Sequence, residues 1–181
     1  MSKAKILIVG ESPYKNKSYT NYTYKRLNIC CQFRKVAFIP RVKKNREYNL
    51  KNIKTYKRVL GVINNIQIND SNFDLFHNNI ENKIKDLAKK GVFLVNQNEF
   101  LKYVNLNKED FIRNDAKFIC FGEVAYNTVI ERVRPNNFTN VYHYPHPSPQ
   151  NSSEFWKDYL EENKNYSEKD ELKTIIESTL K

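Results

Sequence analysis

The sequence has few of the residues that build disulfide-rich or fibrous proteins. Its 181 residues include three cysteines, four glycines and six prolines. Three cysteines, of which Cys30 and Cys31 are adjacent, suit neither a disulfide framework nor a four-thiolate cluster. So little glycine and proline excludes a collagen-like repeat. We therefore expect reduced, structural thiols, and no metal or other cofactor.

Long apolar runs are missing as well. No segment approaches the roughly 18 residues that a membrane span needs, and the first residues lack the pattern of a secretory signal. Hydrophobic residues nevertheless make up 40% of the chain, which argues against disorder. We expect one globular domain over residues 1–181, monomeric, away from membranes and in the cytoplasm, or in the nucleus or a viral factory if the source is eukaryotic or viral.

Acidic residues are nearly absent from the first third of the chain. Residues 1–60 contain 16 Lys and Arg against Glu11 and Glu47, a net charge of +14, whereas residues 61–181 have a net charge of −3. A cationic segment that is also rich in Tyr and Asn suits a surface that follows a phosphate backbone. DNA is therefore the expected partner. The alternative is an AT-rich coding bias that favours Lys, Asn, Tyr and Ile everywhere.

Short apolar runs alternate with segments of helical period. Strands are predicted at residues 5–10, 35–40, 91–97, 117–122 and 140–146, and helices at 72–91, 122–134, 152–165 and 167–181. In the first of these helices, one stripe is formed by Leu75, Ile80, Ile84 and Leu87. The lysine-rich stretch 41–58 is typical of a solvated helix or loop. This alternation predicts an α/β fold, a central, mostly parallel sheet flanked by helices, with ligands at the carboxyl ends of its strands.

Four of the predicted strands end in polar motifs. In chain order these are Gly10-Glu11-Ser12-Pro13-Tyr14, Val95-Asn96, Phe121-Gly122-Glu123 and His146-Pro147-Ser148-Pro149. The ordered set resembles the uracil-DNA glycosylase superfamily, whose members carry a GQDPY-like loop after the first strand, an Asn after an apolar strand, and an HPSP loop after the last strand. The resemblance covers nearly the whole chain in order and spacing. It implies a glycosylase that needs no cofactor.

His146 is the residue with the clearest chemical role in this resemblance. Excising a base requires flipping it out of the stack into a pocket. Breaking the glycosidic bond then leaves a pyrimidine anion, so a hydrogen-bond donor aimed at its O2 is the main requirement. Neutral His146 can be that donor, and Pro145 and Pro147 on either side restrict its backbone.

Recognition of the base is expected to come from an amide and from aromatic rings. The Asn96 amide can pair with the N3 and O4 edge of a uracil-like base, although an Asn at a strand end can also simply make a turn. Tyr14 matches the ring that excludes the thymine methyl group in uracil-specific members, or else packs its own loop. Tyr22 or Tyr24 is predicted to stack on the flipped base.

The two loops are also expected to hold the DNA strand. By the resemblance, Ser12 and Ser148 with the backbone amides of their loops contact the phosphates beside the flipped nucleotide. The other residues expected to contact DNA are Lys15, Lys17, Pro147 and Gln150. The lysines would make the affinity dependent on salt.

Two positions depart from the family pattern. Ser12 stands where uracil-specific members have the Asp that positions the attacking water, and Glu11 is the nearest carboxylate that can take over this role. Gln150 stands where the family often has a leucine wedge, and a glutamine fills a gap in duplex DNA less well. This second departure points to single-stranded DNA, a different lesion or a modified pyrimidine.

The sequence thus predicts a DNA glycosylase for uracil or a modified pyrimidine, with His146, Glu11 and Ser12 as catalytic residues. An alternative from another class is a weak or inactive member of this fold that serves as a DNA-binding module in a replication or phage-defence assembly. An enzyme acting on free nucleosides or nucleotides is a third interpretation, but it leaves the cationic first third of the chain without a use.

Overall fold

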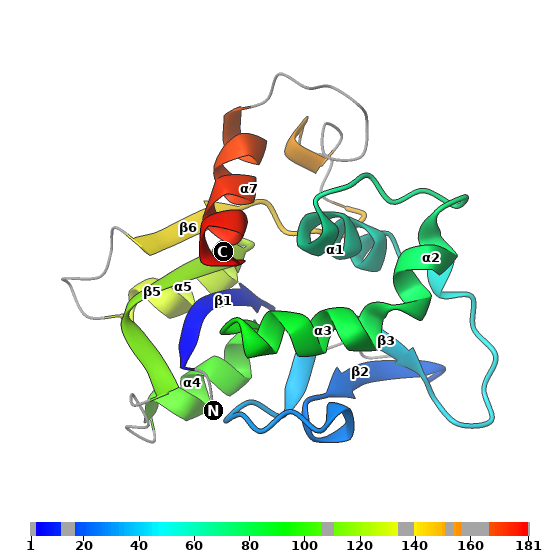
Figure 1. Ribbon diagram of the computed structural model, residues 1–181, viewed down its shortest axis with the longest axis horizontal. Helices are drawn as coiled ribbons and strands as arrows, with labels where there is room; N and C mark the ends of the chain where they lie inside the picture. The colour runs from blue at the N-terminus through cyan, green and yellow to red at the C-terminus, as the bar shows by residue number, and fades with distance from the viewer. Residues whose placement is uncertain are drawn as a thin grey trace.

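The computed structural model describes residues 3–11, 17–105, 111–133, 140–150, 154–156 and 167–180 (Figure 1). The strands are β1 (Ala4–Gly10), β2 (Tyr19–Thr23), β3 (Lys35–Val42), β4 (Val92–Asn96), β5 (Ile112–Phe121) and β6 (Val141–Tyr144). The helices are α1 (Lys54–Asn64), α2 (Phe73–Asn78), α3 (Ile80–Lys89), α4 (Gln97–Asn105), α5 (Glu123–Ile130) and α7 (Ser167–Leu180), with short 3-10 turns η1 (Lys25–Leu27) and η2 (Leu50–Asn52).

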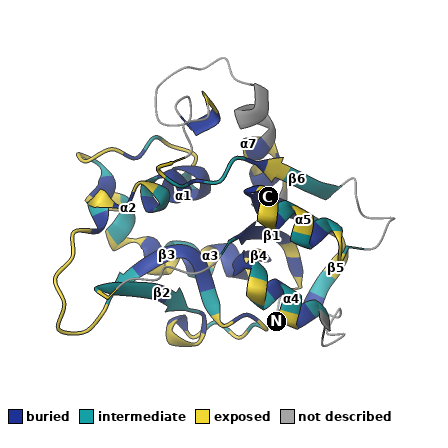
Figure 2. Ribbon diagram, turned by 180° about the vertical axis from the view of Figure 1, so that it is seen from behind, coloured by how far each residue is buried: buried dark blue, intermediate teal, exposed yellow. Residues whose placement is uncertain are grey.

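Four strands form a central sheet in the order β4-β1-β5-β6, and every neighbouring pair is parallel. Helices α4 and α5 pack on one face of this sheet, and α3 and α7 lie on the other (Figures 1 and 2). The predicted α/β fold with a parallel sheet between helices is therefore confirmed. In the described ranges, no helix combines the length and apolar character that crossing a bilayer requires.

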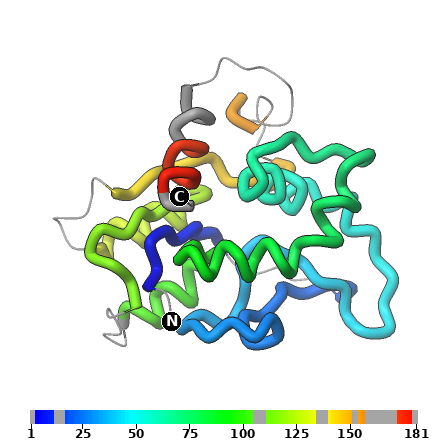
Figure 3. Tube along the Cα trace, viewed as in Figure 1, coloured from blue at the N-terminus to red at the C-terminus, as the bar shows by residue number. Residues whose placement is uncertain are grey.

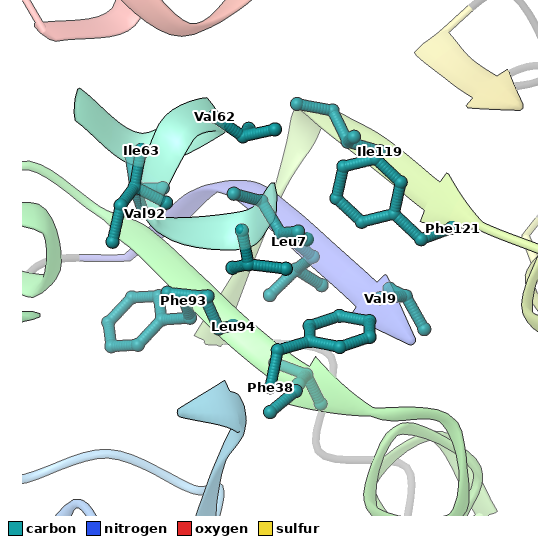
Figure 4. Packing of buried hydrophobic residues seen from close by; sticks show 14 of the residues in the cluster. Leu7, Val9, Phe38, Val62, Ile63, Val92, Phe93, Leu94, Ile119 and Phe121 are labelled. Carbon is teal, nitrogen blue, oxygen red and sulfur yellow. The ribbon is translucent and has the colours of Figure 1, made fainter. Parts of the chain in front are cut away.

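The middle strand, β1, explains why short apolar runs mark this fold. It is covered on both faces, and its residues Ile6 to Val9 are almost completely buried. A strand that is buried on both faces needs apolar residues at successive positions rather than at alternate ones. Figure 4 shows the result on the α1 side, where Val62 and Ile63 of α1 pack against Leu7 of β1.

The apolar run at 35–40 does form a strand, β3, but this strand lies outside the central sheet. It pairs antiparallel with β2, for example through Tyr19 and Val42, in a separate two-stranded sheet. Neither β2 nor α4 was indicated by the sequence pattern. An apolar run predicts burial, but it does not say which strand will be its partner.

The predicted helix at 72–91 is two helices, because the chain leaves helical geometry at Asn79 between α2 and α3. The break changes the phase of the apolar stripe. Ile80, Ile84 and Leu87 are buried as predicted, but Leu75 is 64% exposed, so its assignment to the same stripe is wrong.

Tyr24 makes hydrogen bonds at the outer edge of the sheet that a neighbouring strand would otherwise make. Among the described residues, β4 is an edge strand of the sheet, yet Leu94 in its middle is buried. The Tyr24 hydroxyl donates to the Leu94 carbonyl (3.0 Å) and accepts from the Leu94 amide (2.9 Å). Only 1% of Tyr24 is exposed, and burial raises its pKa well above the usual range. A ring enclosed in this way has no face open to a nucleotide, so we withdraw Tyr24 from the residues expected to stack on a base.

Replacing Tyr24 by Phe should lower the free energy of unfolding by about 1–3 kcal/mol. The substitution keeps the ring but leaves a buried amide and a buried carbonyl of Leu94 without a partner, which carries a cost of this size. Urea denaturation measures the change. Tyr48→Phe is the matched control, because Tyr48 is exposed. If both variants unfold at the urea concentration of the parent protein, the hydroxyl bridge does not stabilise the sheet edge.

Candidate functional site

The parallel register brings four strand ends to one edge of the sheet. Gly10 at the end of β1 is aligned with Asn96 at the end of β4, and Phe121 at the end of β5 is aligned with Tyr144 at the end of β6. The chain segments that follow these strands begin side by side. The motifs that carry the family resemblance therefore meet at the carboxyl edge of the sheet wherever they are described.

Gly122 is the point at which Glu11 and His146 approach each other. Its φ is +94°, which favours glycine, and a Cβ atom placed on it would lie 3.1 Å from Cβ and Cδ2 of His146. The same Cβ would lie 3.2 Å from Oε1 of Glu11. The imidazole and the carboxylate thus share the space that the absent side chain leaves open.

The hydrogen bonds of His146 define which ring nitrogen carries the proton. The backbone amide of Ser148 lies 3.1 Å from Nδ1 of His146. Because a backbone amide only donates, Nδ1 is the acceptor and a neutral ring carries its hydrogen on Nε2. Burial lowers the pKa of His146, and the negative charge of Glu11 opposes this shift. His146 is thus held as a neutral ring whose Nε2–H can donate.

The loop around His146 is braced from two further sides. The indole Nε1 of Trp156 donates to the Pro145 carbonyl (2.9 Å), and Nη1 of Arg58 donates to the Ser148 carbonyl (2.6 Å). The Arg58 guanidinium also lies over the Trp156 ring, 5.4 Å from its centroid, and its burial lowers the pKa of Arg58. These contacts fix the backbone on both sides of the histidine, as a preorganised donor requires.

Asn96 carries a polar group that the fold itself does not use. The residue is 2% exposed, and its Nδ2 atom is buried without a hydrogen-bond partner among the described residues. The same holds for Oε1 of Gln97, the first residue of α4. A buried polar group without a partner costs about 1–3 kcal/mol, which a bound ligand would recover. The Asn96 amide is therefore available for a polar ligand at the edge of the sheet.

Phe38 is a site residue that the sequence analysis missed. Its ring covers Gly10 so closely that a Cβ on Gly10 would lie 1.8 Å from Cζ of Phe38. The ring centroid is 5.9 Å from that of Phe121 and 6.3 Å from that of His146, and Figure 4 shows the ring beside Val9 at the tip of β1. Its φ of +61° is unusual for a bulky residue and marks a locally strained backbone. Nothing in the run KVAFIP signals this conformation.

The rings predicted to stack on a base lie elsewhere. The Tyr22 hydroxyl hydrogen-bonds to Glu81 of α3, and burial together with this carboxylate raises the pKa of Tyr22. Tyr24 is enclosed at the sheet edge, as described above. Of the described aromatic residues, Phe38 is the one that packs against both Gly10 and His146.

The remaining predicted residues divide into three groups. Pro147 is buried and Ser148 is half-buried, and the backbone of Ser148 already serves the loop through its amide and carbonyl. Lys17 and Gln150 are exposed. The predictions for Ser12, Tyr14 and Lys15 lie outside the described residues. Within the described ranges, no group of three or more His, Cys, Asp or Glu side chains is arranged to hold a metal ion.

The geometry predicts that His146 is neutral at pH 7, with its proton on Nε2, and titrates below the ordinary histidine value of about 6.5. Removing the Glu11 charge in Glu11→Gln should lower this pKa further, because a nearby carboxylate favours the protonated ring. NMR of the imidazole nitrogen and carbon signals measures both properties, and His146→Ala identifies the signals. An Nδ1–H tautomer, or a pKa that rises in Glu11→Gln, would contradict this description of the site.

Comparison with known proteins assigns no family to the chain. No protein-family model, curated protein or solved structure matches it. Its function must therefore be inferred from the residues that meet at the strand ends and from the motifs that they form.

Proposed function

We propose that the protein is a DNA glycosylase that hydrolyses the bond between deoxyribose and a flipped-out uracil or modified pyrimidine. One observation carries the proposal. A neutral histidine whose Nε2–H can donate lies beside a carboxylate and an aromatic ring, and a buried amide nitrogen without a partner among the described residues lies at the same carboxyl edge of the sheet. The groups are those of His146, Glu11, Asn96 and Phe38.

In this proposal, His146 stabilises the leaving base. As the bond between C1′ and the ring nitrogen breaks, its electron pair remains with the pyrimidine and negative charge develops on O2. The Nε2–H of His146 donates a hydrogen bond to that oxygen without giving up its proton. The Ser148 amide and the bracing contacts of Arg58 keep the donor oriented, so that no reorganisation is needed during the reaction.

Glu11 supports the sugar side of the same step. Deoxyribose gains positive charge as the base departs, and a carboxylate beside His146 is placed to stabilise it. A water molecule oriented by Glu11 then forms the new bond to C1′, and its proton passes to solvent or to the released base. This role departs from the resemblance, in which an Asp at the position of Ser12 positions the water and the position of Glu11 carries a side chain that contacts the base or braces the loop.

Recognition of the base falls to Asn96 and Phe38. Pairing of the Asn96 amide with the N3 and O4 edge would give its buried Nδ2 the partner that it lacks among the described residues. The Phe38 ring, packed over Gly10 and only 7% exposed, would form an apolar wall beside the flipped base. By the resemblance, Tyr14 closes the space beside C5.

His146→Ala should reduce excision about 100- to 1000-fold, about 3 kcal/mol of transition-state stabilisation, while DNA affinity stays nearly unchanged. The loss is confined to the reaction because the donor acts on charge that develops only as the bond breaks. Alkaline cleavage of abasic sites measures excision on oligonucleotides that carry uracil, hydroxymethyluracil or other modified pyrimidines. His143→Ala is the matched control, since His143 is exposed on β6 and stacks on Tyr126. An equal loss of affinity and rate would make His146 a phosphate contact instead.

The alternative function, a binding module without catalysis, is favoured by one specific feature. Ser12 has no carboxylate, so it cannot act as a base or stabilise the sugar cation. In this alternative the same pocket binds DNA without cleaving the glycosidic bond.

Two substitutions distinguish the enzyme from the binding module. In an active glycosylase, Glu11→Gln should lower excision, because Glu11 has taken over the water, and Ser12→Asp should raise it by restoring a carboxylate. The same cleavage assay measures both. If the parent protein excises no pyrimidine and Ser12→Asp gains activity on uracil, the protein is a binding module. If neither protein excises any base while both bind DNA, the pyrimidine pocket itself is refuted.

A further inference from the structure

We propose that Tyr19, Tyr48, Lys44 and Arg46 form a platform for single-stranded DNA beside the candidate site. We refer to these four residues as the tyrosine platform. The inference rests on the proposed function only in taking DNA as the nucleic acid. It adds a second surface that contacts DNA and a preference for unpaired strands. No residue of the tyrosine platform belongs to the pocket at the strand ends.

Two aromatic rings supply the stacking surface. Tyr19 begins β2, and its ring centroid lies 4.8 Å from that of Tyr48, with 52° between the ring planes. Tyr48 is 38% exposed, which places it among the few large hydrophobic residues that are exposed in the described part of the chain. Exposed aromatic faces stack on bases of any sequence, and each such contact is worth about 1–3 kcal/mol.

The loop that carries Tyr48 has a net positive charge, from Lys43, Lys44 and Arg46 against Glu47. Residues 43–49 are all exposed and form the loop that projects from the end of β3, yellow in Figure 2 and cyan in Figure 3. A turn from the Arg46 amide to the Lys43 carbonyl (3.2 Å), with Asn45 at φ +62°, shapes this loop. No ion pair between described residues involves Lys44 or Arg46. Their charges are therefore available to phosphates.

The strand that carries the Phe38 ring, β3, ends beside the platform. Val42 at the end of β3 is paired with Tyr19, and Phe38 is four residues earlier on β3. Four strand residues span about 13 Å, which equals about four stacked nucleotides at 3.4 Å each. A DNA strand with one base at Phe38 can therefore reach Tyr19 and Tyr48 with nucleotides close to that base.

Single-stranded DNA is the ligand that can use both the aromatic stacking surface and the positive charges of the platform. Stacking on a tyrosine ring needs an open base face, which a single strand offers along its length and a duplex offers only at its ends. Duplex DNA would meet Lys44 and Arg46 through its phosphates alone. The exposed Tyr48 ring thus favours single strands over duplexes, in agreement with Gln150 in place of a wedge that fills a duplex.

Fluorescence anisotropy with a labelled oligothymidine of about 12 nucleotides, and with the duplex of the same length, tests the platform. Neither DNA contains uracil, so the result does not depend on excision. Tyr48→Ala should weaken single-strand binding about 5- to 150-fold and leave duplex binding unchanged, whereas Tyr48→Phe should bind like the parent protein. Tyr126→Ala is the control, because Tyr126 stacks on His143 at the other edge of the sheet.

The charges are tested by a Lys44→Ala, Arg46→Ala double variant. Its slope of log affinity against log salt should be smaller by about 1.4, since two single-strand phosphate contacts are removed. The platform is overturned if Tyr48→Ala binds the single strand like the parent protein, or loses single-strand and duplex binding equally. Tighter binding of the parent protein to an RNA of the same length would overturn the assignment to DNA. These outcomes leave the glycosylase proposal standing, because excision is measured separately.

Discussion

The parallel register of β1 with β4 and β5 is the constraint on which the rest of the structure depends. Gly10 can lie beside Asn96 only because five residues of β1 are aligned with five residues of β4, and Val9 is aligned with Cys120 of β5 in the same way. A shift of one residue would turn each side chain to the opposite face. At Gly10 such a shift would also bring a side chain to a position where the Phe38 ring leaves no room for a Cβ atom. The order of the strand ends, and hence the candidate site, follows from core packing.

Once the strands are fixed, contacts with residues outside the strand ends keep the candidate site in place. Arg58 and Trp156 hold the backbone on either side of His146, and the Ser148 amide selects its tautomer. Two features of this arrangement are energetically unfavourable, the positive φ of Phe38 and the Asn96 Nδ2 atom, which has no hydrogen-bond partner among the described residues. Strained backbone and unsatisfied polar groups are concentrated at functional sites, where a ligand or a reaction offsets them.

The sequence predicted the central strands and the polar residues at their ends, because buried parallel strands are apolar runs that stop where the sheet ends. It did not predict contacts that depend on tertiary packing. Phe38 lies at the site because of a backbone conformation that no local sequence feature indicates. Tyr24 is buried because its hydroxyl group bonds to the edge strand β4, a contact that the sequence does not show. The break at Asn79 was likewise not predicted, because apolar residues occur at helical spacing in the helices on both sides of it. Strand ends can thus be predicted from sequence, whereas the aromatic residues that surround them cannot.

The central claim is that the strand ends form a pocket for a pyrimidine base. It is tested most directly by following the side-chain amide signals of the protein by NMR during titration with free uracil. The proposed pocket predicts that the Asn96 amide signals shift with uracil concentration, and that those of the exposed Asn98 two residues later do not. Asn96→Asp identifies the Asn96 signals, because a carboxylate has no amide protons. If the Asn96 signals stay unchanged at saturating uracil, or shift together with those of Asn98, the strand ends do not form a pyrimidine pocket.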